Sequence, residues 1–155
     1  MKVCWFSCGV SSFVACYLTQ DIDRIIYTHI PDQHPDSIRF LHDCEILLGR
    51  EIEILQSEQY EGVDDVIEKT RCINTPYGAP CTKWLKKQVR KDWEVKNPDH
   101  HIYVWGYDEN ERNRADRLVG TMTDYEHEFP LIDSELSKME CHGIAEKLGL
   151  RRPTM

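Results

Sequence analysis

Two patterns of apolar residues alternate along the chain. Short runs rich in β-branched and aromatic residues, such as residues 24–28, predict buried strands. Apolar residues at helical spacing predict helices between them, for example over residues 36–48, where Gly49 provides a stop signal. The predicted strands cover residues 2–6, 24–28, 51–55, 101–105 and 126–129, and the predicted helices cover 13–18, 36–48, 62–70, 82–96, 109–118 and 134–148.

This order predicts an α/β fold: a three-layer parallel sheet with helices on both faces, because parallel strands are joined by crossover helices. Residues 72–80 contain Asn74, Pro76, Gly78 and Pro80, which predict a loop. The chain of 155 residues is the size of one ordinary domain, and we expect a single domain over residues 1–155.

Composition narrows the class of protein. No apolar run approaches the roughly 20 residues that span a bilayer, and no signal peptide is recognised, so we expect a cytoplasmic protein without a membrane partner. The net charge of −8 disfavours a protein that coats nucleic acid. Seven cysteines without a C-x-x-C pair indicate reduced thiols, several of them in the core, and we expect neither zinc nor an iron–sulfur cluster.

The loop after the first predicted strand is the strongest candidate for chemistry. Ligands of parallel sheets bind beyond the carboxyl ends of the strands. This loop, residues 7–12, consists of Ser7, Cys8, Gly9, Val10, Ser11 and Ser12. Gly9 would let the backbone approach a ligand and take a positive φ, and the serines at a helix start would favour an anion. An ordinary serine cap after a turn is the alternative.

The segment from Phe6 to Ser12 resembles the PP-loop, S-G-G-x-[DS]-S, of the adenine nucleotide α-hydrolase-like superfamily. That superfamily includes ATP pyrophosphatases and the phosphoadenosine phosphosulfate (PAPS) reductases. Gly9 matches the second glycine and Ser12 the final serine, while Cys8 replaces the first glycine. Ser11 in place of the frequent aspartate is more similar to the sulfonucleotide reductase branch. The resemblance implies a HUP or Rossmann-like fold that binds ATP, adenosine phosphosulfate (APS) or PAPS.

Later segments resemble the same branch in the same order. The end of the second strand, with Thr28, His29 and Ile30, is placed like the strand end that borders the adenine. The run from Cys81 to Lys86 resembles C-[CT]-x-x-L-K, and the run from Gly106 to Arg112 resembles G-x-x-x-x-E-x-R. A P-L-I-[DE] segment follows at residues 130–133. The relatives we expect are small, often phage-encoded, PAPS reductase-like proteins.

The end of the sequence departs from this pattern. The reductases carry a nucleophilic cysteine in a C-terminal tail, and the phage-like relatives continue past a Pro-x-Met segment into N-N-C-x-x-C. This sequence ends at Met155. The resemblance therefore predicts a form without the cysteine-containing tail, which binds an adenine nucleotide and releases no sulfite.

Residues 83–96 form a basic segment in an acidic chain, with six basic side chains against two acidic ones. Lys83 and Lys86 are predicted to contact phosphate or sulfate, together with Arg112, whose fork suits a phosphate. Lys87, Lys91 and Lys96 are predicted to lie on a solvated helix face. His100 and His101 are expected at a loop and on a strand surface.

Four further residues are weaker candidates. Asp32 could hold Mg²⁺ that accompanies ATP, although a turn-forming aspartate is the more common case. Cys81 is the candidate catalytic thiol, because Lys83 and a helix start would both lower its pKa. Glu109 and Glu111 could hold a metal or simply begin a helix.

The sequence therefore predicts an adenine nucleotide-binding protein, either an ATP pyrophosphatase or a sulfonucleotide-using enzyme. The alternative is a catalytically inactive nucleotide-binding or regulatory module. A homodimer is compatible with the sequence, and an RNA or DNA acceptor of the activated group stays open.

Overall fold

The computed structural model describes residues 1–73 and 79–154, with the side chain of Cys81 left out. The predicted loop over residues 72–80 therefore falls largely outside the described residues. Among the residues described, no helix combines the length and the apolar character needed to cross a membrane.

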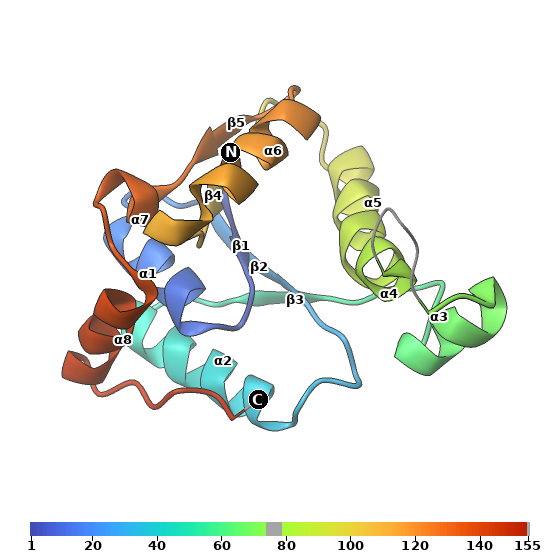
Figure 1. Ribbon diagram of the computed structural model, residues 1–155, viewed down its shortest axis with the longest axis horizontal. Helices are drawn as coiled ribbons and strands as arrows, with labels where there is room; N and C mark the ends of the chain where they lie inside the picture. The colour runs from blue at the N-terminus through green and yellow to red at the C-terminus, as the bar shows by residue number, and fades with distance from the viewer. Residues whose placement is uncertain (74–78, 155) are drawn as a thin grey trace. The chain divides into compact units, whose positions relative to one another are not determined.

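A five-stranded sheet forms the centre of the fold, in the order β3-β2-β1-β4-β5 (Figure 1). Its strands are β1 (Lys2–Phe6), β2 (Arg24–Thr28), β3 (Glu53–Leu55), β4 (Ile102–Trp105) and β5 (Glu126–Glu128). The central strand β1 pairs in parallel with β2 and with β4, so that Cys4 lies opposite Ile25 on one side and Val104 on the other. β5 pairs in parallel with β4. The predicted parallel α/β fold, flanked by helices, is confirmed.

Helices connect the strands as the sequence predicts. They are α1 (Val10–Leu18), α2 (Asp36–Leu48), α3 (Val63–Thr70), α4 (Pro80–Thr82), α5 (Gln88–Lys96), α6 (Arg112–Thr121), α7 (Pro130–Asp133) and α8 (Lys138–Lys147). A π-helical turn, η1 (Lys83–Lys87), joins α4 to α5, and a 3₁₀ turn, η2 (Glu109–Glu111), precedes α6. π-helical turns occur often at functional sites.

Several helix starts differ from the prediction, among them those of α1 and α8. α1 begins at Val10 rather than at residue 13, so the serines of the loop belong to its first turn. The last helix begins at Lys138 rather than at residue 134, because Glu135 takes a positive φ of 55°. The hydroxyl of Ser137 then accepts a hydrogen bond from the Glu140 amide at 3.2 Å and caps the helix.

The chain divides into two compact units. The first unit comprises Met1–Tyr27, His34–Glu53 and His100–Met155, and the second comprises Thr28–Gln33 and Ile54–Asp99.

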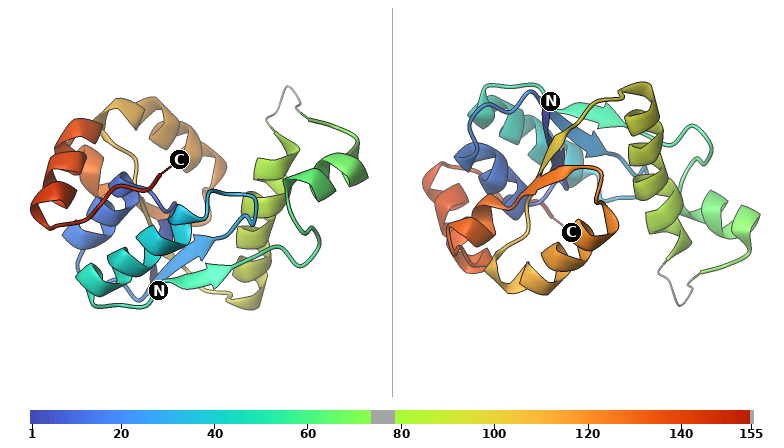
Figure 2. Two further views of the ribbon diagram at one scale, coloured as in Figure 1. Left: turned by 90° about the horizontal axis from the view of Figure 1, so that it is seen from below. Right: turned by 90° about the horizontal axis from the view of Figure 1, so that it is seen from above.

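The core of the first unit lies on one face of β1. Phe13 and Val14 of α1 are fully buried there, together with Cys4 of β1 and Leu41 of α2. α1 packs against α8 and α2, and the three helices lie on the same side of β1 (Figures 1 and 2). Because α1 is enclosed in this way, its first turn has a fixed position at the carboxyl end of β1.

Aromatic rings pack around β4. His101, which the sequence placed on the strand surface, is instead fully buried, and its ring packs beside those of Tyr103 and Tyr125, which stack on each other. The Trp105 indole donates to Nδ1 of His127 at 3.0 Å, and Nε2 of His127 lies 2.8 Å from the Met122 carbonyl. These two contacts assign the neutral Nε2–H tautomer to His127.

The second unit has a small core of its own. Ile30, Tyr60, Val66 and Leu85 are buried together, and the rings of Tyr60 and Trp84 lie 5.5 Å apart.

Candidate functional site

The strand order places a topological switch point beside β1. The chain proceeds from β1 to β2 on one side and reaches β4 on the other, so the loops after β1 and β4 leave the sheet as neighbours. Open parallel sheets bind ligands in the crevice between two such loops. In the first unit these loops are residues 7–9 and residues 106–108, followed by the first turns of α1 and η2.

The segment predicted to bind phosphate, residues 7–12, is called the phosphate loop below and differs in one detail from the prediction. Gly9 has φ −122° and ψ 165°, an extended conformation that any residue adopts, so the expected positive φ at Gly9 is wrong. The positive φ belongs to Cys8, at 62°. This is the position at which the PP-loop motif carries its first glycine, and glycine takes this conformation without a steric cost.

The first turn of α1 presents backbone amides rather than hydroxyls. The Ser12 side chain is 1% exposed; its hydroxyl donates to the Gly9 carbonyl at 2.8 Å and accepts from the Gly9 amide at 3.3 Å. The Phe13 amide makes the first helical bond, to the Gly9 carbonyl. Helix geometry leaves the preceding amides, those of Val10, Ser11 and Ser12, without intrahelical acceptors, and the helix dipole favours an anion there. Ser7 is exposed and Val10 is buried.

Gly106 fixes the distance between the two loops. A Cβ built on Gly106 would lie 2.6 Å from Cα of Ser12 and 2.8 Å from its nitrogen. Only a residue without a side chain allows β4 to end so close to the first turn of α1. The resemblance assigned Gly106 to the nucleotide site, and the structure brings it against the phosphate loop.

Two residues beside the loop were missed by the sequence analysis. Asp108 is 6% exposed, and its carboxylate accepts from the Asn110 amide at 2.9 Å. Cys141 of α8 is fully buried, and its thiol lies close to the Ser11 side chain and to the charge of Asp108. The D-x-x-E spacing after the strand could have identified Asp108 as a helix cap. No local signal could have paired Ser11 with a residue so distant in the sequence.

Arg112 and its acidic neighbours surround the start of α6. Arg112 is exposed, and its Nη2 lies 3.4 Å from the Ile132 carbonyl. Glu111 completes a capping box with Asp108 and binds Arg114 at 2.9 Å. Glu111 therefore acts as a helix start, the second of the two roles that the sequence allowed.

The remaining predicted ligand residues belong to the second unit. Thr28 ends β2, the His29 amide donates to the Leu55 carbonyl at 2.7 Å, and Ile30 is buried. Lys83 and Lys86 lie in the π-helical turn, and Nζ of Lys83 lies 4.9 Å from the Trp84 ring centre.

Asp32 also lies in the second unit. Its Oδ2 accepts from the Val63 amide at 2.5 Å, at the start of α3. Across residues 1–73 and 79–154, no three His, Cys, Asp or Glu side chains are grouped to hold a metal ion.

Two thiols adjoin the phosphate loop in the described residues. Burial raises the pKa of Cys8 and that of Cys141 to about 11 each. Their thiolate fractions are small at neutral pH, so neither is an activated nucleophile. The candidate thiol of Cys81 lies outside the described side chains.

A comparison with solved structures decides the fold. The chain superposes on phosphoadenylyl-sulfate (PAPS) reductase from Candida auris, solved as a phosphate complex, with a TM-score of 0.72 over 98% of this chain and 74% of the reductase chain. This chain has a PAPS reductase-like fold. The two sequences are 9% identical, so the likeness concerns the fold alone. No protein-family model and no curated protein matches the chain, and a relation to small phage proteins stays a prediction.

Proposed function

We propose that this chain binds an adenine nucleotide, with the phosphates at the first turn of α1. The observation that carries the proposal is the meeting of the phosphate loop with Gly106 at the switch point of a PAPS reductase-like sheet. Three amides without intrahelical acceptors and a helix dipole form an anion site there.

The proposal assigns separate parts of the nucleotide to separate residues. Backbone amides of residues 10–12 bind one phosphate group. Arg112, whose guanidinium is exposed in the first unit, supplies a charged contact. By the resemblance alone, Thr28, His29 and Ile30 border the adenine, and Lys83 and Lys86 neutralise phosphate or sulfate.

The described side chains do not fit a magnesium cage. Asp32 already accepts an amide hydrogen bond at the start of α3, and Asp108 caps η2. Any Mg²⁺ in the proposal is the ion that ATP carries on its own phosphates, and no step is assigned to a protein-bound metal.

Two uses of the nucleotide follow from the proposal. As an ATP pyrophosphatase, the protein would transfer an adenylyl group to an acceptor and release pyrophosphate. As a nucleotide-binding module, it would bind without turnover. The raised pKa values of Cys8 and Cys141 favour both of these uses over sulfonucleotide reduction by thiols of the loop.

A thermal-shift panel with ATP, AMP, APS and PAPS tests the proposal. A ligand at about 100 times its Kd stabilises the fold by about 2.7 kcal/mol, which raises the melting temperature by roughly 5–10 °C in a chain of this size. Pyrophosphate release from ATP then separates the enzyme from the binding module, and sulfite release from PAPS or APS tests the reductase activity.

Variants of the loop and of the π-helical turn η1 test which residues bind the nucleotide. Gly9→Val should remove the shift while the protein stays folded, because a Cβ at Gly9 meets only the Ser7 hydroxyl, at 3.6 Å. Lys83→Ala and Lys86→Ala should each weaken binding by about 1–3 kcal/mol, whereas the exposed Lys91→Ala should have no effect. An unchanged shift in folded Gly9→Val would refute binding at this loop.

A further inference from the structure

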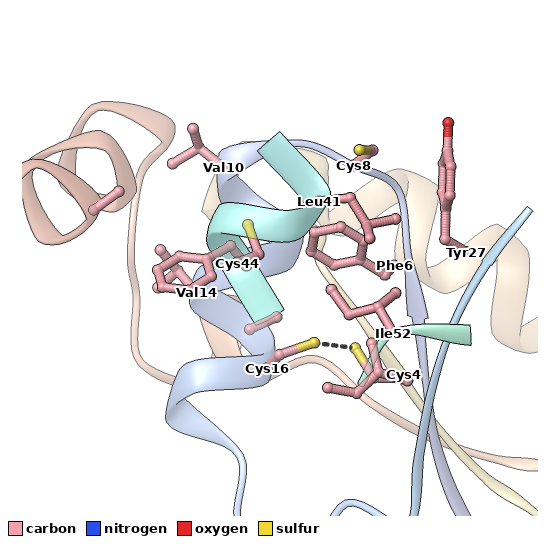
Figure 3. Packing of buried hydrophobic residues seen from close by; sticks show 14 of the residues in the cluster. Cys4, Phe6, Cys8, Val10, Val14, Cys16, Tyr27, Leu41, Cys44 and Ile52 are labelled. Atoms are coloured by element: carbon pink, nitrogen blue, oxygen red, sulfur yellow. Dashed lines mark hydrogen bonds between the residues drawn. The ribbon is translucent and has the colours of Figure 1, made fainter. Parts of the chain in front are cut away.

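Two cysteine thiols meet behind the phosphate loop. Cys4 lies in β1 and Cys16 in α1, and their sulfur atoms are 2.6 Å apart in the core of the first unit (Figure 3). Unbonded heavy atoms normally pack at about 3.5–4 Å, whereas a disulfide bond measures about 2.05 Å. The two side chains thus already point at each other at less than packing distance, from the strand and the helix that carry the loop.

The neighbouring cysteines are not arranged in the same way. The Cys8 thiol donates to the Ser37 carbonyl at 3.0 Å, and Cys44 of α2 is fully buried near Cys16. Burial, with the neighbouring Cys4 as a further cause, raises the pKa of Cys16 well above its usual range, and Arg50 opposes this effect. Cys16 is therefore a slow nucleophile whose nearest sulfur is that of Cys4.

A cavity gives a small molecule a route to the pair. It has a volume of about 490 Å³ and is lined by Cys16, by Tyr17 and Thr19 at the end of α1, and by Leu48 and Arg50 at the end of α2. Cys4 is fully buried, whereas Cys16 is 4% exposed and lines this cavity. A peroxide fits such a space easily.

We propose that Cys4 and Cys16 are a modification site, at which a peroxide converts the two thiols into a disulfide. The Cys16 thiolate attacks one oxygen of hydrogen peroxide, the O–O bond breaks, and a sulfenic acid forms while hydroxide leaves and takes up a proton. The Cys4 sulfur then attacks the sulfenic sulfur, the S–S bond forms, and water leaves with the Cys4 proton. In sum, two thiols lose two electrons and two protons, and one peroxide becomes two molecules of water.

The bond would close a ring around the phosphate loop. Residues 4–16 include all of residues 7–12, so oxidation ties the middle of β1, which precedes the loop, to the second half of α1, which follows it. The cross-link lowers the conformational entropy of the unfolded chain and limits opening of the loop in the folded one.

The experiment treats the reduced, purified full chain with hydrogen peroxide and measures intact mass, a non-reduced peptide map, amide hydrogen exchange and the melting temperature. We expect a mass loss of about 2 Da, a Cys4–Cys16 cross-linked peptide and slower amide exchange over residues 7–12. The melting temperature should rise by roughly 6–12 °C, as expected for a closed loop of this length in a chain of this size, and a reductant should reverse all four changes.

Three variants give the controls. Cys4→Ala and Cys16→Ala should each lose the cross-link and the rise in melting temperature, whereas Cys72→Ala, at a half-exposed cysteine, should keep both. Should either core variant fail to fold, the peptide map of the unsubstituted chain decides. A map in which Cys4 and Cys16 stay reduced, or in which Cys16 is linked to Cys44, would overturn the proposal. Neither result depends on nucleotide binding.

Discussion

Gly106→Ala should displace the first turn of α1. The added methyl group would lie 2.6 Å from Cα and 2.8 Å from the nitrogen of Ser12, where ordinary contacts begin at 3.4 Å. The obstacle is backbone, so no side chain can rotate away from it. Either the end of β4 or the start of α1 must shift by several tenths of an ångström, in a core where Val14 and Phe13 hold the helix.

The size of the effect follows from known costs of overpacking. Inserting a methyl group into a well-packed core costs about 1–3 kcal/mol. Because the contact at Gly106 involves two backbone atoms, we expect a value of about 2–3 kcal/mol. This corresponds to a fall of roughly 4–12 °C in the melting temperature of a chain of this size. Under the proposed function, the same shift moves the anion-binding amides and weakens the nucleotide.

The matched control is Gly143→Ala, in the interior of α8. A Cβ built on Gly143 meets nothing within 4 Å, so alanine should stabilise the helix by about 0.5–1 kcal/mol. Urea unfolding followed by circular dichroism measures both variants. The reasoning would be refuted if Gly106→Ala unfolded within about 0.5 kcal/mol of the unsubstituted chain, since the two loops could not then meet at this distance.

Two further predictions concern the loop and the C-terminal residues. Cys8→Gly should change the free energy of unfolding by less than about 1 kcal/mol, because glycine removes the strain of the left-handed conformation and this gain offsets the lost burial. Cys8→Val should lower the free energy of unfolding by more than about 2 kcal/mol. Equal urea midpoints for the two variants would contradict this prediction. The guanidinium of Arg39 and, as a second cause, the hydrogen bond from the Thr154 amide hold the pKa of Asp36 well below its usual range. Residues 151–154 should therefore stay bound to α2 as the pH falls to about 4 and should be released only in more acid solution. The Thr154 amide resonance reports this anchoring, with Asp36→Asn as control, and release near pH 6 would exclude it.

Local patterns predicted the elements of this chain well, because each pattern reflects a contact within a few residues. The stop at Gly49 is an example: its φ of 64° is the left-handed conformation that ends a helix. The position of His101 was not predictable in this way. Its burial results from stacking on Tyr125, which comes from a segment beyond α6. The sequence pattern around His101 is that of an exposed strand surface, but packing against a distant segment buries the side chain.

The phosphate loop shows the same division between local and distant causes. Its composition predicted an anion site, but three distant contacts hold it in place. Gly106, directly after β4, packs against Ser12, Cys141 of α8 lies close to Ser11, and the Cys8 thiol donates to the Ser37 carbonyl in α2. A loop held from three elements keeps its amides oriented before any ligand arrives, so binding pays little for ordering them. Under the proposed function, the fold thus contributes to affinity by holding the loop in place.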